Sequence, residues 1–211
     1  MPFIDILRDK TQESCIAMTK LLEKEINLKY LTSRSCDLIQ CVVWYALYHP
    51  PEKVPKGMKL ITELIRNSKI KTLDIATLNH DLLIEKVLSN ESIKYIDGFG
   101  QPDGDVRWFE PELYDNPDTK INIFKLHGSI NWYRFRTEED GKTIYKYGCI
   151  TNIDYEHCKD SEGKMMNNLD HKPMFLTGSY NKMYDYGFGV FSKVHHKFFD
   201  RLSNCDIIIM I

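Results

Sequence analysis

Two short polar segments of this 211-residue chain contain side chains that could carry out chemistry. The first is Thr77-Leu78-Asn79-His80-Asp81, and the second is Lys125-Leu126-His127-Gly128-Ser129. The imidazole of His127 exchanges its proton near neutral pH, so this residue is a candidate general base. Gly128 would let the backbone approach a ligand closely. The segments therefore indicate a candidate site at which a ligand could lie beside a base.

Each segment also has a purely structural interpretation. Asp and Asn are preferred at the N-termini of helices, where Asn79 or Asp81 would accept hydrogen bonds from the first backbone amides. A single histidine at a strand end can be a hydrogen-bonded structural residue, and Gly128 can belong to a tight turn. Neither segment alone decides between these interpretations.

The elements expected around the segments place both at one edge of a sheet. Residues 73–77 and 121–126 predict strands, and residues 83–88 predict a helix with its apolar side chains facing inward. In a parallel sheet, both polar segments would follow the carboxyl ends of their strands. Ligands bind at that edge in open α/β sheets.

The rest of the pattern predicts an α/β fold with a helical N-terminal part. Residues 38–47 predict a buried helix, and residues 58–65 a short amphipathic one. Residues 93–96 predict a second strand, residues 97–120 a long irregular loop, and residues 132–172 a small inserted subdomain. Strands alternating with helices predict a Rossmann-like, doubly wound and mostly parallel sheet in a single domain of residues 1–211.

The C-terminal pattern predicts one more strand. A helix is expected over residues 191–202, and the apolar run of residues 207–211 is typical of a central strand buried on both faces. Such a strand normally leads into a loop of the ligand site. We therefore expect the 211 residues to be a fragment of a longer protein.

Composition and charge exclude several classes of function. A hydrophobic content of 43% and a formal net charge of −2 give no electrostatic reason to expect nucleic acid as a partner. No apolar run is long enough to span a bilayer, and the first residues lack a signal-peptide pattern, so a cytoplasmic protein is expected. The six cysteines contain no CxxC pair. Cys149, His157 and Cys158 do not make a four-ligand set, so no metal is expected.

Two weaker candidates lie in the C-terminal part of the chain. His195 and His196 lie in the expected helix, where a solvated face is favoured over a metal site. Tyr180, Tyr184 and Tyr186 could form a mobile aromatic loop over a ligand, although a surface loop with partly packed rings is favoured.

Taken together, the two segments resemble the sirtuin superfamily, in which a strand ending in Thr-x-Asn-x-Asp precedes a strand ending in Lys-Leu-His-Gly-Ser. Three further features narrow the resemblance to one branch of this superfamily. They are Asp97-Gly98-Phe99, Asn131-Trp132 and the helix containing Phe198-Phe199-x-x-Leu202. They are more similar to the sirtuin-like domains of bacterial proteins, including NAD hydrolases of anti-phage defence, than to histone deacetylases. The resemblance covers residues 70–211 and, more loosely, the preceding helices.

The resemblance implies a role for each matching residue. Asn79 would hold the nicotinamide ribose and orient the attacking water or hydroxyl group, and Asp81 would bind the nicotinamide carboxamide. His127 would be the base that removes a proton from a ribose hydroxyl group or a water. The implied cofactor-binding set, with NAD as the substrate, comprises Thr77, Asn79, Asp81, Gly128 and Ser129. The oxocarbenium-like state of N-glycosidic cleavage suits such a site, because positioning and local electrostatics stabilise it.

Three departures from the family pattern affect what is expected. Leu78 stands where sirtuin deacylases usually have Gln, which removes a hydrogen bond to the ribose. The zinc-binding CxxC pairs are absent. The Gly-Ala-Gly-x-Ser phosphate loop is also absent, and a second glycine-containing loop would follow Ile211. The domain would thus be truncated at both ends, and we expect this chain alone to bind NAD weakly and turn it over little.

The sequence therefore predicts an NAD glycohydrolase that releases nicotinamide and ADP-ribose, acting in bacterial defence. One alternative is an NAD-dependent protein deacylase, which the missing zinc module disfavours. Another is a non-catalytic nucleotide-binding or interaction domain, which the missing loops favour. The expected partners are NAD and either a second copy of the chain or other domains of a larger protein, and neither nucleic acid nor a membrane is expected.

Overall fold

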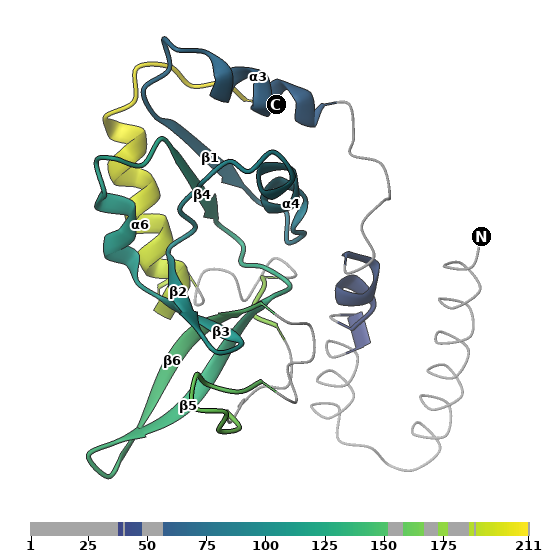
Figure 1. Cartoon of the computed structure of the whole chain (residues 1–211), viewed down its shortest axis with the longest axis vertical. Coiled ribbons are helices and arrows are strands. Elements are labelled where there is room, and N and C mark those ends of the chain that lie inside the picture. The colour runs from purple at the N-terminus through teal and green to yellow at the C-terminus, as the bar shows by residue number, and fades with distance from the viewer. Residues whose placement is uncertain are drawn as a thin grey trace, which may run out of the picture. The chain divides into compact units, whose positions relative to one another are not determined.

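The computed structural model describes residues 38–39, 41–47, 57–151, 158–166, 173–176, 186–187 and 189–210 (Figure 1). Contacts divide the chain into two compact units, Met1–His49 and Pro50–Ile211. In the first unit, residues 41–47 are helical, as the sequence predicts. The expectation that this helix is wholly buried is wrong, because Ile39 is 54% exposed and Tyr45 is 37% exposed.

A short parallel sheet positions the two polar segments in the second unit. Strand β1 (Leu73–Thr77) pairs with β4 (Ile121–Lys125), in register from Leu73 opposite Ile121 to Thr77 opposite Lys125. Both strand predictions are confirmed. The strand expected at residues 93–96 is reduced to one parallel bridge between Ile96 and Asn122. Strand β4 is therefore flanked on both sides, and all five of its residues are buried.

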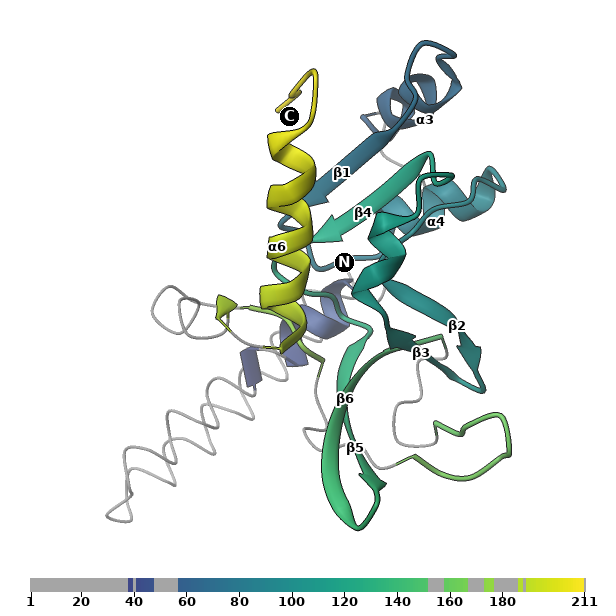
Figure 2. The same ribbon diagram turned by 90° about the vertical axis from the view of Figure 1, so that its left-hand side faces the viewer.

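Helices cover both faces of this sheet. They are α3 (Met58–Arg66), α4 (Leu83–Asn90) and α6 (Gly189–Ser203), and the sequence predicts all three. Ile121 and Ile123 of β4 pack with buried residues of α3 and α4, whereas Phe124 packs with α6. Because neighbouring side chains of a strand point to opposite faces, α4 and α6 lie on opposite sides of the sheet (Figure 2).

A second sheet is antiparallel and contains four strands in the order β2-β3-β6-β5. Its strands are β2 (Phe99–Asp103), β3 (Val106–Phe109), β5 (Trp132–Glu139) and β6 (Lys142–Ile150). The expectation of an irregular loop at residues 97–120 is therefore wrong, since this stretch forms β2, β3 and the short 3-10 helix η1 (Pro111–Asp115). Pro102 fits there because β2 is an edge strand. This sheet joins residues 99–109 to part of the subdomain expected at 132–172.

The terminal apolar run does not form the expected strand. Residues 207–210 pair with no strand among the described residues, and Ile207 and Met210 are 80% and 92% exposed. An apolar run shows only that burial would be favourable, and it becomes a strand only where another strand offers its backbone groups. The described fold is therefore mixed α/β, with a parallel pair and a four-stranded antiparallel sheet. No helix in the described ranges is both long and apolar enough to cross a membrane.

Candidate functional site

The two polar segments lie side by side at the carboxyl edge of the parallel sheet, as the sequence predicts. Strands β1 and β4 end opposite each other, and the Leu126 amide donates to the Thr77 carbonyl at 3.0 Å. Beyond the strands, the His80 carbonyl accepts hydrogen bonds from the Ile130 amide at 3.0 Å and from the Ser129 hydroxyl at 3.3 Å. These bonds join two segments that are distant in sequence into one loop pair.

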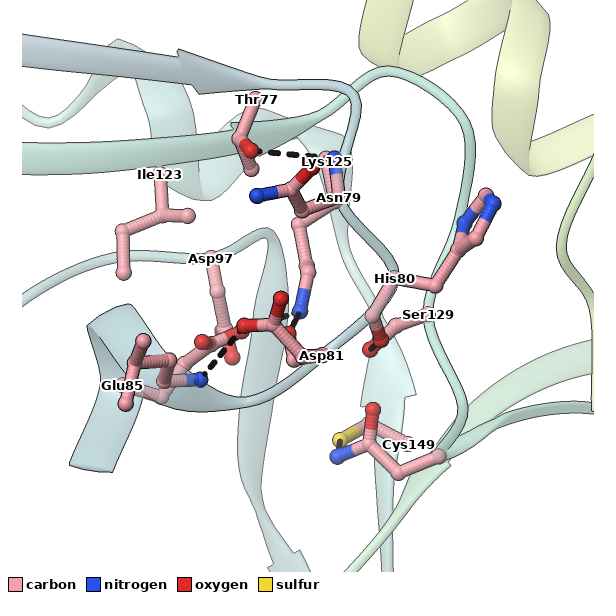
Figure 3. A network of polar contacts seen from close by, with 12 residues as sticks. Thr77, Asn79, His80, Asp81, Glu85, Asp97, Ile123, Lys125, Ser129 and Cys149 are labelled. Carbon is pink, nitrogen blue, oxygen red and sulfur yellow. Dashed lines mark hydrogen bonds and ion pairs between the residues drawn. The ribbon is translucent and has the colours of Figure 1, made fainter. Parts of the chain in front are cut away.

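A buried lysine fixes the first segment to the start of α4. The Lys125 ammonium donates to the Asp81 carbonyl and to Oε1 of Glu85, the latter at 2.8 Å. The Lys125 side chain is only 2% exposed. Figure 3 shows the Lys125 side chain running toward Asp81 near the start of α4. Sequence reasoning missed this role, although a lysine inside the mostly apolar stretch of residues 121–126 was a visible signal.

The candidate side chains of the first segment differ in what they contact. Oδ1 of Asp81 accepts the Leu83 amide at 2.9 Å, which satisfies one amide at the start of α4. Oγ1 of Thr77 accepts the Asn79 amide at 3.1 Å and shapes the turn. Asn79 itself is exposed, with its side chain beside Lys125 (Figure 3). The structural interpretation therefore holds for Asp81, and Asn79 presents its side chain to solvent.

Gly128 and Ser129 make their close contacts within the protein. Gly128 has φ +80°, and a Cβ atom there would lie 2.2 Å from the Met174 carbonyl oxygen. The Ser129 amide donates to that same oxygen at 3.1 Å, and Ser129 is fully buried. The backbone that approaches Gly128 is thus residues 173–176 of the chain itself. Both residues set the shape of the loop that carries His127.

His127 is half-buried and lies in an aromatic group. Its Nε2 atom is 2.8 Å from the Tyr186 hydroxyl, and its ring centre is 6.2 Å from that of His80. The first segment thus brings the ring of His80 toward His127. His195 of α6 packs against Tyr186, with ring centres 4.6 Å apart.

The structure corrects one expectation about α6 and leaves another open. His195 is half-buried and its Nε2 is 2.9 Å from the Leu126 carbonyl, so the solvated face expected for it is wrong. His196 is exposed, as expected. Tyr180 and Tyr184 lie outside the described residues. Sequence reasoning missed the contact of Tyr186 with His127, and no local pattern around Tyr186 indicates it.

Cys149 lies beneath the loops as a buried, protonated thiol. Burial raises the pKa of its thiol far above the usual range, and the nearby Asp97 carboxylate raises it further. The Asn131 amide group donates to its sulfur at 3.0 Å. A thiol held this way is a poor nucleophile and a poor metal ligand. His157 lies outside the described residues, and in the described part of the chain no group of three or more His, Cys, Asp or Glu could hold a metal ion.

The comparisons with known proteins add no family. No family model matches this chain, and no curated protein matches it. The geometry of the loop pair and the resemblance of its two segments therefore remain as the indications of function.

Proposed function

We propose that this protein is a sirtuin-like NAD glycohydrolase, which cleaves NAD to nicotinamide and ADP-ribose. The observation that carries the proposal is the joining of the Asn79 and His127 segments through the His80 carbonyl, at the carboxyl edge of parallel strands. Ligands bind at this edge in α/β folds. Helices on both faces of β1 and β4 support the finer proposal that the parallel pair belongs to a Rossmann-like sheet.

The role proposed for each residue depends on how exposed its side chain is. The exposed amide of Asn79 holds the nicotinamide ribose, and Asp81, anchored through one oxygen, binds the carboxamide with the other. The bond between nicotinamide and the ribose breaks with its electron pair going to the nicotinamide nitrogen. Water forms the new bond to the ribose carbon, and His127 takes the proton that this water loses. A role in bacterial anti-phage defence is part of the proposal.

A second candidate is a nucleotide-binding domain without catalysis. The specific observation in its favour is that Asp81, Gly128 and Ser129 are all engaged within the protein. Such a domain would use the same edge of the sheet and would retain NAD unchanged. Protein deacylation would use the same edge too, with an acyl-lysine peptide as the second substrate.

The experiment measures nicotinamide release from NAD by the full-length protein and its variants. His127→Ala and Asn79→Ala should each lower the rate by about 10²–10⁴-fold, because a base or a positioning group is lost. Neither variant should show a large drop in melting temperature, since both side chains lie beyond the apolar part of their strands. His196→Ala, on the exposed side of α6, is the matched control and should retain activity.

Other outcomes decide between the candidates. Tight NAD binding with no nicotinamide release would support the non-catalytic domain. Release that depends on an added acyl-lysine peptide would support the deacylase. Full activity of His127→Ala would remove the proposed mechanism altogether.

A further inference from the structure

The hydroxyl group of Tyr186 engages one ring nitrogen of His127. The atoms Oη and Nε2 are 2.8 Å apart. Tyr186 is half-buried and packs against the cluster that contains Phe124 and residues of α6. The resemblance assigns no role to Tyr186, yet its phenol contacts the residue proposed as the base.

The position of Tyr186 is itself supported from two sides. Its ring packs against His195, whose Nε2 lies 2.9 Å from the Leu126 carbonyl. A carbonyl oxygen can only accept, so this nitrogen carries a hydrogen and donates it. Leu126 is bonded to His127. The four residues therefore form a closed ring of contacts that holds the phenol against the imidazole.

The chemistry of the two groups suggests which way the hydrogen bond runs. A phenol near neutral pH has a proton to donate, and a neutral imidazole has one nitrogen with a free electron pair. If Tyr186 donates, Nε2 carries that electron pair and Nδ1 carries the hydrogen. Nε2 then becomes the basic nitrogen, and any proton that reaches it passes through the phenol.

We propose that Tyr186 and His127 form a proton-transfer pair, in which Tyr186 is a further catalytic residue of the hydrolysis. This inference rests on the function proposed above and adds the path of the proton. The attacking water gives a proton to the phenol oxygen as its own oxygen bonds to the ribose carbon. The phenol gives its original proton to Nε2, so Tyr186 ends neutral and His127 ends as the imidazolium ion.

The first test is made without NAD and does not depend on activity. Nitrogen-15 NMR of the imidazole groups shows which ring nitrogen carries the hydrogen, and the His127 signals are identified by their loss in His127→Gln. We expect Nε2 of His127 to be unprotonated in the wild type at pH 8, and this preference to be lost in Tyr186→Phe. Tyr145→Phe removes a phenol from the exposed part of β6, where Tyr145 is 51% exposed, and should behave as the wild type. A protonated Nε2 in the neutral wild-type ring, or an unchanged preference in Tyr186→Phe, would overturn the pair.

The second test compares kcat and KM for NAD. Tyr186→Phe keeps the ring that packs on His195, so it should fold and bind NAD with a nearly unchanged KM. Its kcat should fall by about 10–10²-fold, the lower part of the range for acid–base assistance. An unchanged kcat would overturn the catalytic role of Tyr186 and leave the function of His127 standing. If the wild type releases no nicotinamide, the proposed function fails, and the NMR result still decides the direction of the hydrogen bond.

Discussion

The Lys125 ammonium lies 2.8 Å from the Glu85 carboxylate, and the two side chains are 2% and 13% exposed. This ion pair joins β4 to α4 directly beneath the Asn79 segment. The same ammonium donates to the Asp81 carbonyl, so one buried charge fixes both the helix and the loop. The candidate site is therefore supported by a residue that contacts no ligand in the proposed mechanism.

Replacing Lys125 alone should destabilise the fold strongly. Lys125→Met leaves the Glu85 carboxylate buried without its cation, and Oε2 of Glu85 already has no hydrogen-bond partner among the described residues. Breaking a buried pair from one side costs about 3–5 kcal/mol of unfolding free energy. Urea denaturation measures this loss. The double variant Lys125→Met with Glu85→Leu should lose clearly less, and an equal loss in both would show that the charge pairing is not the cause.

A side chain at Gly128 should destabilise the fold through a steric clash, and a second glycine with a similar φ angle serves as the control. Gly128 and Gly141 have similar positive φ angles, +80° and +73°, so alanine at either one costs about 1–2 kcal/mol of backbone strain. Only at Gly128 would the new Cβ meet the chain, 2.2 Å from the Met174 carbonyl oxygen. Gly128→Ala should therefore lose a further 1–3 kcal/mol or so in denaturation, through overpacking. Equal losses in the two variants would contradict this tight contact.

The parts of the fold that were predictable are those whose pattern is local. Strand β1, strand β4 and helix α4 follow from apolar spacing within a few residues. Strand β3 was missed because its pairing is distant, with Val106 opposite Ile150, and because glycine and proline surround it. One local signal was overlooked. Asp140-Gly141 is a typical two-residue hairpin turn, and it joins β5 to β6 with positive φ at both residues.

The candidate site was predictable to a similar degree. Two parallel strands were predicted, and this places His127 and Asn79 at one edge of the sheet. The contacts of Asp81, Gly128 and Ser129 could not be predicted from the sequence, because helix capping and ligand binding select the same residue types. Tyr186 contacts His127, and His195 contacts Tyr186 and the Leu126 carbonyl, only because of how α6 packs. Such contacts carry no sequence signal within one chain.

Cys149 should resist alkylation in the folded protein. Alkylating reagents attack the thiolate, and burial raises the pKa of this thiol far above the usual range, so almost no thiolate exists at pH 8. Cys205 and Cys41 are exposed and should react with iodoacetamide under the same conditions. Mass spectrometry of the labelled peptides separates the sites, and labelling in urea shows that every cysteine can react. Rapid modification of native Cys149 would contradict its burial.

Leu78 offers a test of where the nicotinamide ribose lies. Its side chain is 56% exposed directly after β1, so exchanging it for a polar residue should cost little stability. The resemblance places Gln at this position with a hydrogen bond to the ribose, and one such bond contributes about 0.5–1.5 kcal/mol. Leu78→Gln should therefore tighten NAD binding by roughly 2–10-fold, as measured by calorimetric titration.

Leu60 of α3 is 40% exposed and lies outside both polar segments, so Leu60→Gln is the matched control and should leave the affinity unchanged. If both substitutions leave NAD binding unaltered while His127→Ala still lowers the rate of nicotinamide release as expected, the base is correctly assigned and the ribose lies away from Leu78. If Leu78→Gln weakens binding, Leu78 contacts an apolar part of the ligand, and the placement of the nicotinamide ribose beside this residue is wrong.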